Sequence, residues 1–212
     1  MNKKTVPVAV VKRLPRYYRY INELVKADVG RVSSKTLSQK MGLTASQIRQ
    51  DFNCFGGFGQ QGYGYSTNTL NAEISSILGV DVGYRVIVVG MGNLGNAIAN
   101  NINFKKRGVS LIGLFDCDTS KIGNVHQGIE VLDINNLEDF CSRNKPEIAV
   151  LTLPKTVTVP MYEKLKELGI KGFWNFSNME LTPSENIRIE NVHIADSLMT
   201  LCYSIKEMQS EK

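Results

Sequence analysis

The feature that most constrains this chain is an apolar run that ends in closely spaced glycines. Residues 86–89 are Val-Ile-Val-Val, residues 90–95 are Gly-Met-Gly-Asn-Leu-Gly, and Asp116 follows Gly95 by 21 residues. This order predicts a buried strand, a glycine turn and a helix start, with a carboxylate closing the next strand at 109–115. Because a dinucleotide phosphate requires those parts in that order, we expect an α/β Rossmann domain with a doubly wound parallel sheet.

Each glycine of this turn has a separate task in such a site. Gly90 allows a tight turn, Gly92 lets the backbone approach the pyrophosphate, and Gly95 lets helix and strand pack closely. Amides at the helix start supply hydrogen-bond donors and a positive dipole end for the phosphates. Asp116 is placed to bind ribose hydroxyls and would repel a 2′-phosphate, so NADH and NAD+ are expected rather than NADPH and NADP+.

Ligands of such sheets bind at the carboxyl ends of the strands, which extends the predicted site to two later runs. One is the apolar run 148–153, followed by a proline, and the other is the run 172–176. The predicted cofactor-binding residues are Gly90, Met91, Gly92, Asn93, Leu94, Gly95, Asp116, Cys117, Lys121, Thr152, Leu153, Pro154, Asn175, Phe176 and Ser177.

Charge divides the chain into two unequal parts. Residues 1–79 contain 11 Lys and Arg against 4 Asp and Glu, whereas residues 80–212 contain 14 against 16. A basic front half joined to a near-neutral nucleotide-binding half indicates that only the front half meets a polyanion, although a basic surface can also be merely solvated.

The front half has the pattern of a helix-turn-helix. Apolar and aromatic residues recur at helical spacing over 14–25, with cations at the start of that helix. A short second helix is expected from Ser33 or Ser34 to Gly42. Thr44 opens the third helix, and Thr44 and Gln47 match a capping box in which each side chain satisfies the other's amide.

The third helix presents a polar face suited to reading DNA. Ser46, Arg49, Gln50 and Asn53 share one side at helical spacing, opposite an apolar stripe. Arginine and amide side chains are the groups that pair with guanine and adenine edges in the major groove. The glycine- and aromatic-rich segment 55–65 then suits a β-hairpin wing. The predicted DNA-binding residues are Lys12, Arg13, Arg16, Ser46, Gln47, Arg49, Gln50, Asn53, Gln61 and Tyr63.

The rest of the pattern sets the domain plan. A helix over 71–78 leads to a boundary at 79–83, and further elements are expected at 159–168 and near Val192. A terminal helix from Asp196 to about Met208 has an apolar stripe suited to holding a partner subunit. We therefore expect a winged-helix domain over 1–80, the Rossmann domain over 81–195 and a dimerisation helix over 196–212.

Several classes of function lack support. No apolar run approaches the length of about 20 residues that spans a membrane, and the N-terminus lacks a signal-peptide core, so a cytoplasmic protein without a membrane partner is expected. The four cysteines show no metal-ligand spacing, so no metal is expected. His126 and His193 have no paired acid at motif spacing, so no catalytic residue and no enzyme activity are predicted. The nucleotide is expected to be a sensed ligand.

Together these residues resemble the Rex family of bacterial redox-sensing transcriptional repressors over nearly the whole chain. The resemblance rests on residues 12–19, 47–52, 62–65, 90–95, 115–118 and 175–176. It implies a homodimer with an N-terminal winged helix, a C-terminal Rossmann domain and a last helix swapped onto the partner. It also implies binding to palindromic double-stranded operator DNA, repression of genes for NADH reoxidation and fermentation, and release by NADH.

Some positions depart from the family pattern. Gln50 stands where a lysine is common, and Gln60 and Gln61 stand where the wing usually has cations, which should weaken DNA affinity. His193 stands where many members have an aspartate near the nicotinamide, and Asn101 where some have a tyrosine. Because the nicotinamide of NAD+ is cationic, the missing anion predicts a strong preference for NADH and little help to DNA binding from NAD+.

Two other functions fit parts of the sequence. An NAD-dependent oxidoreductase with a DNA-binding appendage would turn over a small alcohol or hydroxy acid. A thiol-based redox repressor would use Cys54, just past the third helix, or Cys117, beside Asp116.

Overall fold

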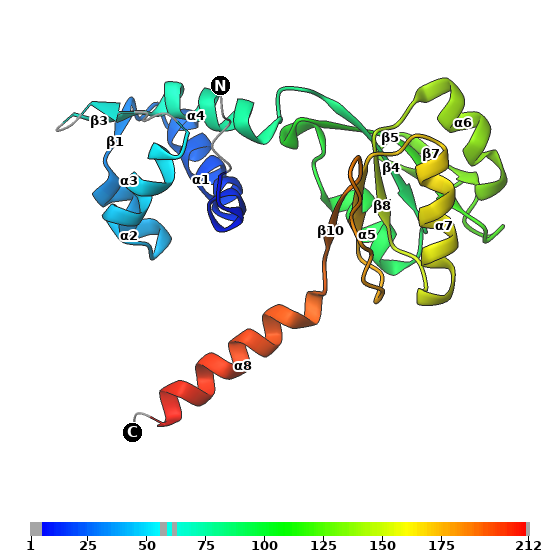
Figure 1. Cartoon of the computed structure of the whole chain (residues 1–212). Helices are drawn as coiled ribbons and strands as arrows, with labels where there is room; N and C mark the ends of the chain where they lie inside the picture. The colour runs from blue at the N-terminus through cyan, green and yellow to red at the C-terminus, as the bar shows by residue number, and fades with distance from the viewer. Residues whose placement is uncertain (1–5, 56–58, 61–62, 211–212) are drawn as a thin grey trace. The chain divides into compact units, whose positions relative to one another are not determined.

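The computed structural model describes residues 6–55, 59–60 and 63–210. The chain divides into two compact units, residues 1–81 and 82–212, and the colours of Figure 1 follow the chain through both. Among the described residues no helix is long and apolar enough to cross a membrane.

The described residues of the first unit form four helices and a small antiparallel sheet. The sheet has the strand order β1-β3-β2, so the β2–β3 hairpin predicted as a wing is present. The helices are α1 (Val8–Lys26), α2 (Ser34–Met41), α3 (Ala45–Asn53) and α4 (Thr67–Leu78), and the strands are β1 (Arg31–Val32), β2 (Gly59–Gln60) and β3 (Gly64–Ser66).

Local capping fixes the ends of the two short helices. The Ser33 hydroxyl accepts from the Thr36 amide at the start of α2, and Gly42 ends that helix in the left-handed region with φ 61°. The Thr44 hydroxyl accepts from the Gln47 amide at the start of α3. The predicted starts of both helices are confirmed. Helix α4 begins at Thr67 rather than at residue 71, because Ser66 caps it from the preceding strand.

One apolar core holds these helices together. Tyr17 of α1 packs edge-on against Phe52 of α3 with ring centroids 5.0 Å apart, and Phe52 packs in the same way against Tyr65 of β3 at 5.1 Å. Ile48 and Leu70 are also fully buried. The inner face of α3 is therefore fixed by α1 and the wing, which leaves its outer face at the surface.

The second unit is built on a seven-stranded sheet of order β10-β9-β8-β4-β5-β7-β6, parallel except for β6. The expected doubly wound parallel sheet is confirmed. Its strands are β4 (Tyr84–Val89), β5 (Val109–Asp116), β6 (Val125–His126), β7 (Ile129–Asp133), β8 (Ile148–Leu151), β9 (Gly172–Asn175) and β10 (Arg188–Asn191).

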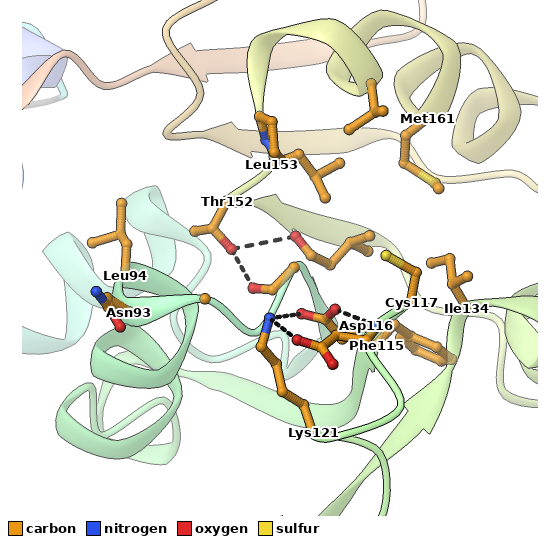
Figure 2. Close-up of a pocket in the computed structure, with 16 residues that line it drawn as sticks. Asn93, Leu94, Phe115, Asp116, Cys117, Lys121, Ile134, Thr152, Leu153 and Met161 are labelled. Carbon is orange, nitrogen blue, oxygen red and sulfur yellow. Dashed lines mark hydrogen bonds and ion pairs between the residues drawn. The ribbon is translucent and has the colours of Figure 1, made fainter.

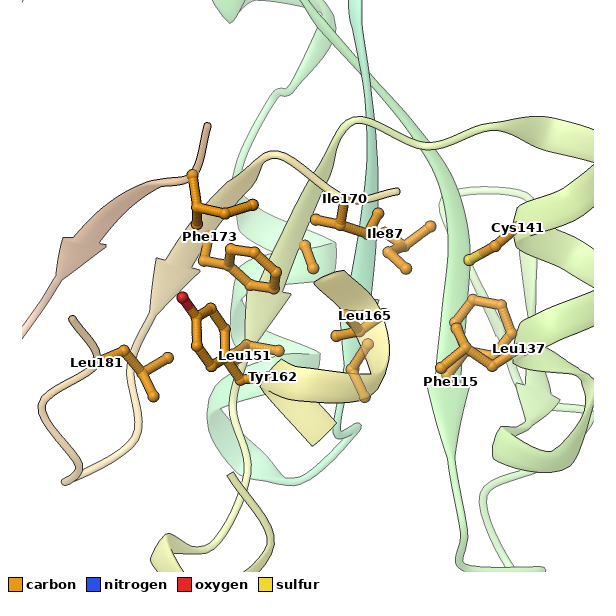
Figure 3. Close-up of a cluster of buried hydrophobic side chains, with 13 residues drawn as sticks. Ile87, Phe115, Leu137, Cys141, Leu151, Tyr162, Leu165, Ile170, Phe173 and Leu181 are labelled. Atoms are coloured by element: carbon orange, nitrogen blue, oxygen red, sulfur yellow. The ribbon is translucent and has the colours of Figure 1, made fainter. Parts of the chain in front are cut away.

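Helices cover both faces of this sheet. Helices α6 (Leu137–Asn144) and α7 (Lys155–Glu167) pack on one face, where Leu137, Tyr162 and Leu165 join the core drawn in Figure 3. Helix α5 (Asn93–Asn101) packs on the other face through Ile98 and Ala99. Helix α7 begins at Lys155 rather than at residue 159, directly after Pro154. Helix α8 (Ile194–Ser210) ends the described chain.

Candidate nucleotide and DNA sites

A hollow of about 760 Å³ lies at the carboxyl ends of β4, β5 and β8 (Figure 2). Strand β4 is where the strand order reverses, which is the position at which such sheets bind dinucleotides. The hollow is lined by Val89, Gly90, Gly92, Asn93, Leu94, Phe115, Asp116, Cys117, Asp118, Lys121, Ile134, Thr152, Leu153, Pro154, Val157 and Met161.

The glycines shape one wall of this hollow. Gly90 has φ +98°, and a Cβ there would lie 2.7 Å from the Thr152 carbonyl oxygen. A Cβ on Gly95 would overlap the carbonyl oxygen of Gly90, so close packing of α5 on β4 requires glycine. Gly92 has no other heavy atom within 4 Å of its Cβ position, so this side of the turn is open.

The start of α5 faces the hollow with free donors. Gly92 is the N-cap residue, and no side chain caps this helix. The first amides of α5, from Asn93 onward, therefore keep their hydrogen-bonding capacity and the positive end of the helix dipole. This is the arrangement that binds a pyrophosphate.

Asp116 is held by the turn that it faces. One carboxylate oxygen accepts the Met91 amide at 2.6 Å and the other accepts the Asp118 amide at 2.9 Å. Burial alone would raise the pKa of Asp116, but these two hydrogen bonds and the ammonium of Lys121 hold it below its ordinary value. A charged carboxylate thus stands in the lining of the hollow at the carboxyl end of β5.

Ten of the fifteen predicted cofactor residues line this hollow, and five do not. Met91 has a buried side chain and contributes its amide to Asp116, and Gly95 lies under the turn. Asn175 and Ser177 are buried and hydrogen-bond each other behind the strand ends. The sequence did not indicate the apolar lining from Ile134, Val157 and Met161, because the pattern that predicts an element does not show which of its residues face a ligand.

The fifth residue, Phe176, lines a second hollow of about 640 Å³ together with Leu94, Val192 and Ile194. Leu94 lines both hollows, so the second one extends the site toward β9 and β10. His193 lies in the sequence between Val192 and Ile194, which both line the second hollow. The Nε2 atom of His193 is 2.9 Å from a carboxylate oxygen of Glu180. The sequence did not indicate this acid, because the pairing depends on the loop after β9.

The outer face of α3 is accessible as predicted. Ser46, Arg49, Gln50 and Asn53 are all exposed. The Arg49 guanidinium donates to the Ser34 hydroxyl at 3.1 Å, which holds it near the start of α2. Lys12 and Arg16 of α1 are exposed as well.

Two predicted DNA-binding residues, Arg13 and Gln47, make hydrogen bonds inside the first unit. Arg13 donates two hydrogen bonds to Asp51, at 2.7 and 2.8 Å. The side-chain amide of Gln47 donates to the same carboxylate at 2.8 Å. The predicted capping box is therefore only half confirmed. The Thr44 hydroxyl accepts from the Gln47 backbone amide, but the Gln47 side chain binds Asp51 and not the Thr44 amide. The Tyr17 hydroxyl completes the set at 2.7 Å. Asp51 is fully buried, and its role as the shared acceptor of these hydrogen bonds was not predicted from the sequence.

The wing receives a cation from a neighbouring strand. Arg31 of β1 donates to the carbonyl oxygen of Tyr63 at 2.9 Å, so its guanidinium lies beside the hairpin turn. Tyr63 is 73% exposed. Gln61 lies outside the described residues. Arg31 thus places a positive charge at a wing whose own sequence, at Gln60 and Gln61, has none.

No group of three or more His, Cys, Asp or Glu side chains that could hold a metal ion occurs among the described residues. Cys54, Cys117 and Cys202 are exposed free thiols. Cys141 is buried, which raises the pKa of its thiol to about 11.

Comparison with known proteins identifies the family of this chain. Residues 5–53 match a family described as a putative DNA-binding protein N-terminus, and residues 81–179 match a CoA binding domain. The redox-sensing transcriptional repressor Rex of Caldicellulosiruptor saccharolyticus is 50% identical over 99% of this chain and 96% of its own length. Its counterpart in Clostridium acetobutylicum is 45% identical over 99% and 98%. The chain belongs to the Rex family.

Solved structures of a Rex-family repressor, RSP, have the same fold as this chain. A complex of RSP with β-NAD+ and operator DNA matches with a TM-score of 0.89 and 48% identity, over 97% of this chain and 95% of the other. A complex of RSP with β-NADH matches with a TM-score of 0.88 and 44% identity, over 97% of each chain. The family assignment therefore rests on the whole chain and not on one domain.

Proposed function

We propose that this protein is a transcriptional repressor that binds palindromic operator DNA as a homodimer and is released when NADH binds. The observation that supports this best is that one chain contains both required surfaces. The polar face of α3 is exposed for a DNA groove, and the glycine turn with Asp116 borders a hollow that suits a dinucleotide. NADH and NAD+ are sensed ligands in this proposal and not substrates.

Helix α8 supports a homodimer. All 17 of its residues are exposed, and they include Ile194, Leu198, Leu201 and Met208, each more than half exposed. An apolar helix face that its own chain leaves uncovered requires a partner. A second copy of the chain is the simplest partner, because helix-turn-helix proteins read two half-sites as dimers.

Within this proposal, the glycine turn binds the pyrophosphate, Asp116 binds ribose hydroxyls and the second hollow accepts the nicotinamide. The ring of NAD+ is cationic and that of NADH is neutral, so the two ligands differ only at that end. A sensor must bind them with different free energies in its DNA-bound and released states, because equal affinities would shift no population.

The test is fluorescence anisotropy of a labelled palindromic duplex, selected by the protein from a randomised pool, titrated with NADH at fixed NAD+. We expect release as NADH rises, and no release with coenzyme A as the control ligand. DNA binding that ignored NADH would contradict the proposal. It would also favour the thiol-based alternative if serine at Cys54 and Cys117 then removed sensitivity to oxidants.

A further inference from the structure

A lysine stands at the ribose end of the nucleotide hollow, where a cation ordinarily favours a phosphate. The ammonium of Lys121 lies 3.3 Å from a carboxylate oxygen of Asp116 (Figure 2). It also lies 3.3 Å from a carboxylate oxygen of Asp118. Lys121 is the one Lys or Arg among the described residues that line this hollow. Its positive charge is therefore shared between two carboxylates.

Asp118 is built to hold that lysine in place. Its second carboxylate oxygen accepts from both the amide and the hydroxyl of Ser120, at 3.0 and 2.7 Å. The Lys121 amide donates to the Asp118 carbonyl oxygen at 3.0 Å, so the chain turns back and returns the lysine side chain toward Asp116. The hydrogen bonds from Ser120, with the ammonium of Lys121, hold the pKa of Asp118 below its ordinary value.

The remaining hydrogen-bonding capacity matches a ribose with free hydroxyls. A carboxylate has about four acceptor sites, and Asp116 uses three of them, for Met91, Asp118 and Lys121. One acceptor therefore remains for a hydroxyl hydrogen. An ammonium has three donors, of which Lys121 uses two, so one remains for a hydroxyl oxygen.

A 2′-phosphate meets the opposite conditions. Two carboxylates and one ammonium leave this end of the hollow with one net negative charge, and a phosphate monoester adds a charge of about −1.5 to −2 at neutral pH. A phosphate also has no donor for the free acceptor site of Asp116. The lysine could offset this only by leaving Asp118.

We propose that Asp118 is a specificity-determining residue: by holding Lys121 against Asp116, it denies a 2′-phosphorylated dinucleotide its cation, so the protein senses NADH and not NADPH. This inference rests on the proposed function, since it concerns the ligand of the same site. Asp116 alone excludes the phosphate by repulsion, whereas Asp118 acts through the lysine.

The experiment measures the dissociation constants of NADH and NADPH by isothermal titration calorimetry on the full chain. In D118N the lysine loses one of its two carboxylates, and we expect the NADPH-to-NADH affinity ratio to rise by about tenfold. In the double variant D118N/K121Q that gain should disappear. Glu138 makes an ion pair with Lys164 at 2.7 Å and does not line the hollow, so E138Q is the matched control for net charge and should leave the ratio unchanged.

The outcomes separate this inference from the proposed function. A D118N ratio within about twofold of the parent value, or a gain that persists in the double variant, would overturn the role of Asp118 while leaving NADH sensing intact. A parent protein that bound no NADH would overturn both. A thermal unfolding midpoint in D118N close to that of E138Q would confirm that the ratio reports ligand recognition and not loss of fold.

Discussion

The carboxylate of Asp51 has no exposed surface, and all four of its acceptor sites are filled, by Arg13 twice, Tyr17 and Gln47. Burial alone would raise the pKa of Asp51, but these hydrogen bonds outweigh it and hold the pKa below its ordinary value. Because Arg13 and Tyr17 belong to α1, the hydrogen bonds of Asp51 join α3 to α1.

Replacing Asp51 by Asn should therefore destabilise the first unit. Removing one partner of a buried ion pair leaves the other uncompensated, at a cost of about 3 kcal/mol. Urea unfolding would measure the loss, and D28N, at an exposed acid of the same unit, is the control. Operator binding should fall in D51N as well. A free energy of unfolding within about 1 kcal/mol of the parent value would show that the network contributes little.

The pair of His193 and Glu180 predicts a pH dependence. The hydrogen bond to Glu180 raises the pKa of His193, against desolvation and with help from the charges of Asp196 and Glu180. The stabilisation from this pair is therefore complete below the unfolded-state pKa of about 6.5 and is lost as pH rises through the higher folded-state pKa. Deprotonation then leaves the Glu180 carboxylate uncompensated beside the second hollow.

That uncompensated anion should attract the cationic ring of NAD+. We expect NAD+ affinity relative to NADH to rise as the pH rises through the raised folded-state pKa of His193, and H193Q to flatten this dependence. The strong NADH preference predicted from the absence of an aspartate remains a prediction, and Glu180 restricts it to the range in which His193 is protonated. Calorimetric titration at several pH values would measure the ratio. A ratio independent of pH in the parent protein would contradict the role of this pair.

Two glycines of the turn between β4 and α5 have different roles, one in folding and one in ligand binding. Alanine at Gly95 would overlap the Gly90 carbonyl oxygen, whereas alanine at Gly92, with φ −72°, meets no heavy atom within 4 Å. We expect G95A to lower the thermal midpoint. G92A should keep that midpoint and lose NADH affinity by about tenfold or more, because its methyl group occupies the path of the pyrophosphate.

The G92A variant should then repress permanently, binding operator DNA without release by NADH. Anisotropy with the labelled duplex would measure this, and calorimetry would give the NADH affinity. Retained NADH affinity in G92A would show that the ligand backbone does not approach this glycine.

The elements that sequence predicted well are those whose signal is local. The Ser33 and Thr44 hydroxyls accept from nearby backbone amides, and the Gly42 amide donates to the Ser38 carbonyl oxygen, so the limits of α2 and the start of α3 follow from the sequence. The side-chain partner of Gln47 does not, since Asp51 attracts it only once α1 has placed Arg13 and Tyr17 nearby. Strand β7 and helix α6 were not predicted. They have five and eight residues, which is too short for a clear periodic pattern of apolar residues. The Glu180–His193 pair depends on tertiary placement alone.

The positive charge of the first unit should set the strength of DNA binding. Residues 1–79 have a net charge of +7, since 11 cations oppose 4 anions. Arg31 adds a cation beside the wing turn, where its guanidinium binds the Tyr63 carbonyl oxygen. We expect R31Q to weaken operator binding and to reduce the slope of log affinity against log salt by about one. The matched control is K171Q, at an exposed cation of the second unit, which should leave the slope unchanged.

Helix α8 is expected to form the interface between two copies of the chain. Its apolar residues, among them Leu198 at 61% and Leu201 at 54%, are exposed on a single chain of 23.6 kDa. If a second copy covers them, L201D should place a carboxylate in the interface, where burial without a partner costs several kcal/mol. Sedimentation should then find a dimer for the parent protein and a monomer for L201D. Operator binding should be weaker in L201D, because the two α3 helices of a dimer must meet half-sites about 34 Å apart.

K206E, which introduces an acid at a charged position of the same helix, is the control and should remain dimeric. A monomeric parent that still bound the palindrome tightly would assign α8 to another partner.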